Sequence, residues 1–334
     1  MTRFLERIPE GSLLFAPMEG ITDEPYRLAL NEAFPEWDHY YTDFLRIPSV
    51  GMYQNSKISD HFGENIFKNN ALKKKTGFQI LTSHRAQTKE HIEKIKALGF
   101  DYLDLNLGCP SKKVNGHKGG AYLLSDLPAL KEILMIIREN FKGLFTVKIR
   151  IGYRDDKNFL DLLKLFEDEG VEAITLHGRT RDQMYDGVAD WKYIKKAVTH
   201  SNLPIIGNGD IWTPQDVQKI FQETGCHGVM LGRGALKTPW LASIYKENLH
   251  RLGNISEEEL LTIRKNNLDL YFYTLEKHYN RREISEDALL RRFKAFSRYL
   301  FDDFQRSSDL RSQFLRSRTL KEFYNHLGKI SSEE

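Results

Sequence analysis

The 334-residue sequence contains little cysteine, no long hydrophobic run and no strong excess of charge of one sign. Its two cysteines, Cys109 and Cys226, exclude a disulfide framework as the organising device and favour a reducing compartment. The longest apolar stretch near the start, residues 13–17, is far shorter than a membrane span or the core of a secretory signal. No cluster of side chains has metal-ligand spacing, so we expect no metal site. These absences predict a cytoplasmic protein that does not associate with a membrane.

The net charge of +3 is small, but it is unevenly distributed along the chain. Residues 281–329 contain 12 lysines and arginines against 7 acidic residues, a local net charge of +5, which leaves −2 for the rest. A basic segment attached to a neutral body favours an anionic partner such as nucleic acid. A solvated helix face would give the same composition, and charge alone does not decide between the two explanations.

Short apolar runs recur at the spacing of alternating strands and helices. The segment of residues 54–75 is polar and ends in three lysines. It predicts either a long loop on the working face of the barrel, where the active site lies, or a loop that is simply exposed to solvent. Eight strands alternating with helices predict an α/β fold of the TIM (β/α)₈ barrel type. The eight runs are nearly continuous in apolar residues, as strands buried on both faces should be, and they are residues 13–18, 39–43, 77–81, 102–107, 145–149, 173–177, 204–207 and 228–231.

The pattern becomes purely helical after about residue 244. Ser256 followed by Glu259 has the spacing of a capping box and predicts the start of a helix. We therefore expect a catalytic barrel over residues 1–245 and a small all-helical domain over residues 250–334. One helix of this domain has an apolar stripe opposite a basic stripe, formed respectively by Leu289, Phe293, Phe296, Leu300 and Phe304 and by Arg291, Lys294 and Arg298.

A glycine-rich loop that contains Cys109 follows one predicted strand. Loops at the carboxyl ends of barrel strands form the active site, and a thiol there can act as a nucleophile or a proton donor. A free cysteine is more often a small buried hydrophobe, but the glycine and polar neighbours of Cys109 argue against burial. Cys226, beside the last predicted strand, fits the buried role, and we assign it no chemistry.

Five motifs along the predicted barrel resemble those of the tRNA-dihydrouridine synthase family and occur in the same order. The resemblance runs across the barrel into the tail, and Glu19, residues 42–46 and Asn115 with Gly116 resemble the dihydrouridine synthase C branch most. It implies an enzyme that uses FMN and NADPH to reduce a uridine of the tRNA D-loop, at position 16 for the C branch. The motifs are Ala-Pro-Met-Glu-Gly at 16–20, Asn-Leu-Gly-Cys-Pro-Ser-Lys at 106–112 with Gly-Gly-Ala at 119–121, His-Gly-Arg-Thr at 177–180, Gly-Asn-Gly-Asp-Ile at 207–211 and Gly-Arg-Gly-Ala at 232–235.

The resemblance implies roles for the residues at the cofactor. Pro17 and Met18 would form the floor beneath the flavin ring. Gln79, Lys148 and His177 would contact its polar edge, where a cation stabilises the reduced flavin. The phosphate would bind the loops after the last two strands, and Asp210 would contribute only its backbone N–H. These loops contain Asn208, Gly209, Asp210, Gly232 and Arg233.

The resemblance also implies roles at the substrate. Hydride from flavin N5 would reach C6 of uracil and Cys109 would protonate C5, which requires a thiol whose pKa is not strongly lowered. Asn106 would contact the flipped-out nucleotide, and the basic stripe of Arg291, Lys294 and Arg298 would bind tRNA phosphates. Arg46 departs from the small residue common in other branches of the family, and we expect it to touch the RNA or its target nucleotide. His117 and Lys118 are bulky where close relatives have small residues. We expect a monomer.

Two other classes of protein would explain part of the sequence. An FMN-dependent barrel oxidoreductase acting on a small pyrimidine, such as dihydroorotate or a dihydropyrimidine, would share the phosphate loops and Lys148 but would not need the basic helical tail. A tRNA-binding protein without catalysis would need the tail but would leave Cys109, Lys148 and His177 unexplained.

Overall fold

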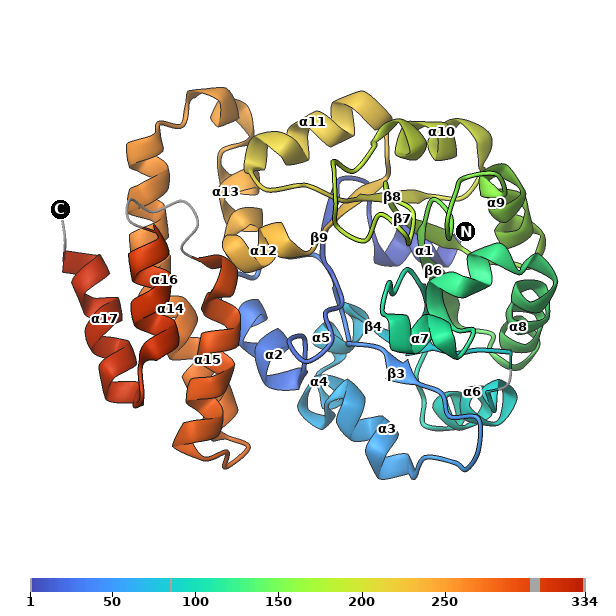
Figure 1. Ribbon diagram of the computed structural model, residues 1–334, viewed down its shortest axis with the longest axis horizontal. Helices are drawn as coiled ribbons and strands as arrows, with labels where there is room; N and C mark the ends of the chain where they lie inside the picture. The colour runs from blue at the N-terminus through green and yellow to red at the C-terminus, as the bar shows by residue number, and fades with distance from the viewer. Residues whose placement is uncertain (1, 85, 301–306, 333–334) are drawn as a thin grey trace.

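Eight parallel strands form a barrel at the centre of the computed structural model, which describes residues 2–84, 86–300 and 307–332 (Figure 1). Each strand pairs with the next in the order β1-β9-β8-β7-β6-β5-β4-β2, and the backbone N–H of Phe15 donates to the carbonyl of His39 to close the ring. The predicted TIM barrel is therefore confirmed. The strands are β1 (Ser12–Phe15), β2 (Tyr40–Tyr41), β4 (Thr76–Leu81), β5 (Tyr102–Leu107), β6 (Leu144–Arg150), β7 (Ala173–His177), β8 (Ile205–Asn208) and β9 (Gly228–Leu231), and the short β3 (Leu45–Arg46) pairs with β4.

Helices surround the barrel and continue beyond its last strand (Figure 1). Those that precede or lie between the strands are α1 (Thr2–Arg7), α2 (Glu24–Ala33), α3 (Asn55–Phe62), α4 (Glu64–Lys68), α5 (Asn70–Lys74), α6 (Thr88–Ala97), α7 (Lys112–Gly116), η1 (Gly120–Ser125), α8 (Leu127–Asn140), α9 (Phe159–Asp168), α10 (Lys192–His200) and α11 (Pro214–Thr224). Those that follow β9 are α12 (Arg233–Lys237), α13 (Leu241–Glu247), η2 (Leu249–Asn254), α14 (Glu257–Asn280), α15 (Glu286–Leu300), α16 (Ser307–Arg316) and α17 (Leu320–Ser332).

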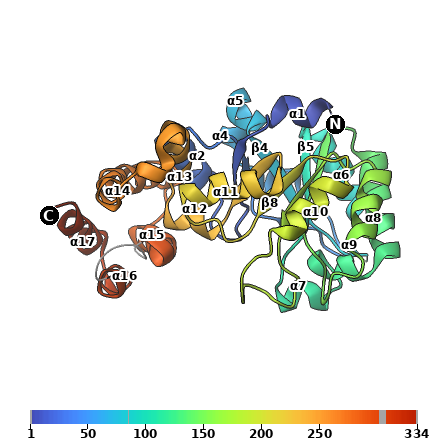
Figure 2. The same ribbon diagram turned by 90° about the horizontal axis from the view of Figure 1, so that it is seen from above.

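The inside of the barrel is packed, and its amino-terminal end is plugged. Phe4 and Ile8, from α1 and the turn after it, belong to one buried cluster with the inward-facing Leu14, Tyr102 and Met230 of three strands. Helix α1 and helix α7 lie at opposite ends of the barrel (Figure 2). The open end is therefore the one at which the strands reach their carboxyl ends, as TIM-barrel enzymes require.

The expectation of a long loop at residues 54–75 was wrong, because this segment forms α3, α4 and α5. Its apolar residues Ile58, Phe62 and Ile66 recur every four positions and are all buried. The Phe62 ring packs 4.9 Å from the ring of Phe100 and 6.0 Å from that of Phe78. Tertiary packing therefore fixes three short helices in a segment whose composition is mostly polar.

The three lysines that end this segment lie far from the open end of the barrel. They precede β4 directly, at its amino end. The ammonium of Lys73 donates to the carbonyl of Gly99, and that of Lys75 donates to the carbonyls of Pro35 and Trp37. Lys73 and Lys75 therefore bind backbone on the plugged side of the barrel, and placing the three lysines on its working face was part of the same error.

The helical region packs against the barrel chiefly through α14 and α2. The hydroxyl of Tyr279 donates to Asp23 at 2.6 Å, and the guanidinium of Arg282 donates to Glu24 at 2.6 Å. The hydroxyl groups of Tyr26 and Tyr271 lie 3.2 Å apart in the buried interface. Both partners of each contact are fixed on helices or directly beside them, so the tail is held in one orientation relative to the barrel.

Two local predictions for the tail agree with the structure. Ser256 and Glu259 form the predicted capping box at the start of α14. On α15 the described members of the apolar stripe are buried. On its basic stripe, Arg291 and Arg298 are exposed and Lys294 is half-buried. Phe304, the last member of the apolar stripe, lies outside the described residues.

Within residues 2–84, 86–300 and 307–332, no helix is long and apolar enough to span a membrane. The domain boundary near residue 250 stays a prediction.

We predict that Glu24→Ala lowers the free energy of unfolding by about 1–3 kcal/mol, because the carboxylate of this buried residue binds Arg282 and the amides of Asn65 and Ile66. Burial opposes ionisation, but these hydrogen bonds outweigh it and lower the pKa of Glu24 from 4.5. A lowered pKa stabilises the fold above the unfolded-state value, and this stabilisation is lost as the pH falls through the folded-state value.

Chemical denaturation at neutral pH and at a pH below 4.5 measures both effects. The control is Glu64→Ala, which removes an exposed carboxylate paired with Lys68 and should change stability by less than about 0.5 kcal/mol. Equal effects of the two substitutions, or a Glu24 effect that persists undiminished at acid pH, would contradict this account.

Candidate active site

One cavity at the open end of the barrel is lined by every residue expected at the cofactor except Gln79. These residues come from the ends of five strands and the loops that follow them, and they meet because carboxyl ends of parallel strands converge. The residues are Pro17, Met18, Lys148, His177, Asn208, Gly209, Asp210, Gly232 and Arg233. Tyr185 and Trp212, which the sequence did not single out, complete the wall with their rings.

Gln79 lies behind this wall and is fully buried. It belongs to a row of hydrogen-bonded polar side chains on neighbouring strands, which we call the buried ladder. Its amide nitrogen donates to Asp104 at 2.7 Å, and its amide oxygen accepts from Asn106 at 2.8 Å. Burial raises the pKa of Asp104 to about 6, although hydrogen bonds from Thr146 and Gln79 oppose the rise. The ladder fixes Asn106 relative to the barrel wall, which is a role that the sequence did not indicate.

Positive charge dominates the cavity wall. Lys148 donates from its ammonium to Asn208 Oδ1 at 3.1 Å, and burial together with the neighbouring Arg150 lowers the pKa of Lys148 to about 8. Burial and the same cations hold the pKa of His177 well below its usual value, so the imidazole is neutral. An anionic ligand with a planar polar edge would therefore be stabilised at this wall.

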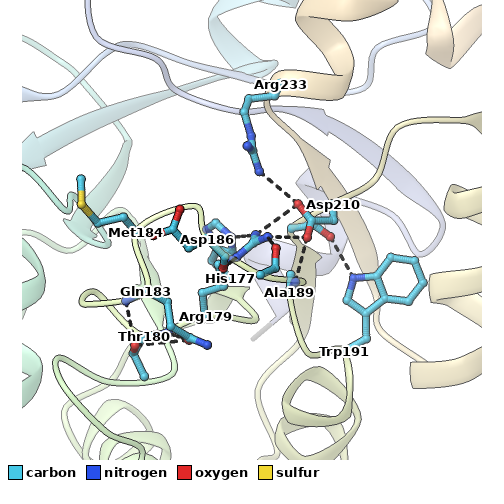
Figure 3. A network of polar contacts seen from close by, with 12 residues as sticks. His177, Arg179, Thr180, Gln183, Met184, Asp186, Ala189, Trp191, Asp210 and Arg233 are labelled. Atoms are coloured by element: carbon cyan, nitrogen blue, oxygen red, sulfur yellow. Dashed lines mark hydrogen bonds and ion pairs between the residues drawn. The ribbon is translucent and has the colours of Figure 1, made fainter.

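Asp210 is a carboxylate inside this basic site, and two arginines neutralise it (Figure 3). Arg179 donates to both of its oxygens, at 3.1 Å and 2.6 Å, and Arg233 donates to one of them at 3.0 Å. The backbone N–H of Ala189 adds a further bond at 2.7 Å. Asp210 has a positive φ of 50°, which costs a non-glycine residue energy. These bonds hold the strained backbone and remove the repulsion that a free carboxylate would exert on a bound anion.

The loop that carries Cys109 is held from three sides. Asn106 Oδ1 accepts from the amides of Gly108 and Cys109, at 3.1 Å and 2.9 Å. Asn115 donates from its side chain to the carbonyl of Cys109 at 3.0 Å. Arg150 donates to the carbonyl of Gly108 at 2.9 Å and ties it to the loop after β7 through Thr180. The thiol is therefore presented on a rigid loop, and Asn106 performs this task whether or not it also contacts a substrate.

The two cysteines have the environments that the sequence predicted. Cys109 is partly exposed, and Cys226 is buried. Burial of the thiol raises the pKa of Cys109, and Glu19 adds a smaller rise, while a hydrogen bond from the backbone of Ser111 and the charges of Arg46 and Arg150 act in the opposite direction. The thiol is thus protonated at neutral pH and suited to donating a proton.

Arg46 lies beside the thiol loop rather than in the cofactor cavity. It lines a neighbouring cavity of about 750 Å³ together with His117 and Lys118. Lys118 has a positive φ of 56°, so this loop carries a strained non-glycine residue next to the cavity. The substrate-binding role of Arg46 stays a prediction, but the structure brings it near the reactive sulfur.

The basic stripe of Arg291, Lys294 and Arg298 lies outside both cavities. Its helix α15 packs against α12, the short helix that begins at Arg233. The stripe is therefore near the open end of the barrel but contributes no side chain to the cavity that contains Lys148. Its function stays a prediction.

Two arginines of the site were not assigned roles from the sequence. Arg150 and Arg179 are almost fully buried, and each connects loops that follow different strands. Their positions could have indicated a role in the site. Arg150 is the last residue of β6, and Arg179 lies two residues beyond the end of β7. A buried arginine needs acceptors on all sides, so such a position indicates a loop anchor as well as a ligand contact.

Among the described residues, no group of three or more His, Cys, Asp or Glu side chains could hold a metal ion.

Comparison with known proteins identifies a family. A family model described as dihydrouridine synthase matches residues 14–333. The chain is 30% identical over 260 residues to tRNA-dihydrouridine synthase B of Pasteurella multocida, covering 75% of this chain and 74% of that protein. It is 33% identical over 247 residues to tRNA-dihydrouridine(16) synthase of Shigella flexneri, covering 72% and 77%. These similar values do not single out one branch of the family.

Solved structures with the same fold are more distant. Histamine dehydrogenase from Rhizobium sp. 4-9 superposes with a TM-score of 0.51 at 12% identity, over 77% of this chain and 48% of that one. A 2-naphthoyl-CoA reductase superposes with a TM-score of 0.54 at 11% identity, over 70% of this chain and 50% of that one. The chain thus spans about half of each structure, and at this identity the likeness concerns the fold alone.

We predict that Cys109 reacts slowly with iodoacetamide at neutral pH and that its rate rises about tenfold per pH unit towards and beyond pH 9, since the thiolate is the reactive form. Cys226 should stay unmodified until the protein unfolds, because it is 2% exposed. Mass spectrometry of the alkylated protein measures both sites, and Cys226→Ala should leave the Cys109 profile unchanged. Rapid, pH-independent alkylation of Cys109 would show a lowered pKa and would exclude the thiol as a proton donor.

Proposed function

Because the chain belongs to the dihydrouridine synthase family, we propose that it is an FMN-dependent enzyme that uses NADPH to reduce the C5=C6 bond of a uridine in tRNA. The observation that carries the proposal is that a cation-lined cavity and the loop that presents the partly exposed thiol of Cys109 lie at the same end of the barrel and are joined by Arg150. Relatives named for tRNA-dihydrouridine synthesis support the substrate. By the motifs that resemble the C branch, we further propose position 16 as the target and a monomer as the active form.

The residues of the cavity fit FMN. Lys148 and Arg233 supply positive charge, and the one carboxylate on the cavity wall, among the described residues, is neutralised by two arginines. Gly209 has a φ of +117°, and a Cβ there would lie 2.7 Å from the Cβ of Ala189, so glycine is required where the chain passes the proposed phosphate site. When bound, FMN would supply hydride for C6 of uracil after being reduced by NADPH.

Each side chain of the wall has a task in this proposal. Lys148, oriented by Asn208, would place its positive charge at the polar edge of the ring, where the reduced cofactor is anionic. Pro17 and Met18 would form the apolar floor. Arg233 would bind the phosphate while Asp210 fixes the direction of its guanidinium. Gln79, which is buried, would reach the cofactor only at the inner edge of the cavity.

Cys109 would complete the reduction by giving its proton to C5 of uracil. The hydride adds to C6 and the proton adds to C5, so the double bond becomes a single bond and the thiolate regains a proton from solvent. Asn106, Asn115 and Arg150 hold the loop so that the sulfur keeps one position during the transfer. The target base must leave its stack to enter the barrel, which makes the protein a base-flipping enzyme.

Arg46 and the basic stripe would bind the RNA. Arg46 is next to the thiol loop and would contact the target nucleotide or its neighbour. Arg291, Lys294 and Arg298 would bind phosphates, since α15 packs beside the helix that opens at the cofactor cavity. The catalytic cavity and the RNA-binding surface would then belong to different parts of the chain that are rigidly joined by α2 and α14.

We predict that Cys109→Ala lowers the rate of dihydrouridine formation in tRNA by about 10²–10⁴-fold, which is the usual contribution of a general acid. FMN content and its reduction by NADPH should be unaffected, because neither involves the thiol. Cys226→Ala is the matched control and should retain full tRNA reduction, since its thiol is buried beside β9. Wild-type rates from Cys109→Ala would remove the thiol from the mechanism.

We predict that neutralising Arg291, Lys294 and Arg298 weakens tRNA binding and reduces its salt-dependence slope by about 0.7–0.9 for each phosphate that the variant no longer binds. FMN content should not change, because the barrel binds the cofactor. The measurement is tRNA affinity across a salt series. The control variant neutralises Lys68, Lys164 and Lys219, which are three exposed lysines on outer barrel helices. If both variants bind tRNA alike, the stripe is only a solvated face.

A further inference from the structure

We propose that Arg179 is a positioning residue that holds His177 as a neutral imidazole with its proton on Nδ1. His177 lines the cofactor cavity, whereas Arg179 lies behind it and is 1% exposed. The tautomer itself follows from contacts within the protein. Its consequence, that His177 can only donate a hydrogen bond to a ligand, rests on the proposed function.

The tautomer follows from what a guanidinium can do. Arg179 Nη1 lies 3.2 Å from His177 Nε2, and Figure 3 draws the two side chains next to each other. A guanidinium has donors and no acceptor, so Nε2 must accept and cannot carry the proton. The same edge of the ring is packed by Gly209, where a Cβ would lie 2.9 Å from His177 Cδ2. Nδ1 has no hydrogen-bond partner among the described residues, and it is the nitrogen left for a ligand.

Arg179 cannot turn away from His177, because all five of its N–H groups are used. Besides the bond to His177, Nη1 and Nη2 donate to the two oxygens of Asp210. Nε donates to the carbonyl of Asp186 at 3.1 Å, and Nη2 also donates to that of Gly187 at 2.6 Å. This fork fixes the guanidinium in one plane, which a lysine at the same position could not reproduce.

The charges around His177 also favour the neutral imidazole. Lys148 and Arg150 from β6, Arg179 from the loop after β7 and Arg233 from α12 all disfavour protonation, in addition to burial, and they hold the pKa of His177 well below its usual value. Asp210 is already bound by two of these arginines, and the ring of Tyr185 lies 6.4 Å from the imidazole. Lys148 and Arg233 therefore supply the charge at the cavity wall, and His177 supplies a directional N–H donor.

The test is nitrogen NMR of the histidine side chains in the cofactor-free protein, with His177 assigned by comparison with His177→Gln. In the wild type we expect a protonated Nδ1, an unprotonated Nε2 and no titration from neutral to mildly acidic pH. In Arg179→Met/Asp210→Asn, which leaves no unpaired carboxylate, we expect a mixture of the two neutral tautomers, because burial, Lys148 and Arg150 still disfavour protonation of His177. Asp210→Asn alone is the matched control and should keep the wild-type tautomer, because Arg179 still donates to Nε2.

A proton on Nε2 in the wild type, or an unchanged tautomer in the double variant, would overturn the proposal. Arg179→Lys gives a second route if the double variant does not fold, since an ammonium with three donors cannot reproduce the five bonds of the guanidinium and should release the tautomer. FMN affinity is the companion readout: at neutral pH it should be weaker in the double variant than in Asp210→Asn, because only part of the His177 rings then present an N–H to the ligand from Nδ1. If the wild type bound no FMN, the proposed function would fail, yet the tautomer would still be measurable.

Discussion

Four cations, Lys148, Arg150, Arg179 and Arg233, converge on the open end of the barrel, where Asp210 supplies negative charge. Burying like charges together is unfavourable, and the pKa values of Lys148 and Arg150 are accordingly lowered, to about 8 and about 10. The fold accommodates this because the arginines donate to backbone carbonyls of several loops as well as to Asp210. The need to satisfy these guanidinium groups therefore orders the loops around the cavity.

The same constraint links the cavity proposed for the cofactor to the thiol of Cys109, the proposed proton donor. Arg150 binds both the loop that begins at Gly108 and the loop after β7, so the position of Cys109 depends on the same cation cluster that shapes the cavity wall. Asn106 adds a second link, because it connects the Cys109 amide to the buried ladder of Gln79 and Asp104. The proposed binding site for an anionic ring and the proposed proton donor are thus built from one polar network.

The sequence predicted the barrel and most of the cavity for a physical reason. Strands buried on both faces are continuous apolar runs, and residues at their carboxyl ends must converge, so Lys148, His177 and Asn208 could be placed together without coordinates. The helices at residues 54–75 were missed although Ile58, Phe62 and Ile66 have helical spacing, because the segment is mostly polar and the burial of Phe62 depends on Phe78 and Phe100, which are distant in sequence. The role of Asn106 as a loop anchor was hidden in the same way, since it depends on which atoms its amide faces.

The most direct test of the account is a single-turnover experiment under anaerobic conditions. FMN-loaded protein is reduced with NADPH, freed of excess nucleotide and mixed with unmodified tRNA transcript or with free uracil, while flavin absorbance is followed. The account predicts that the transcript reoxidises the flavin and gains one dihydrouridine per flavin oxidised, whereas free uracil has no effect. Reoxidation by free uracil at the same rate, or no reoxidation by tRNA, would contradict it.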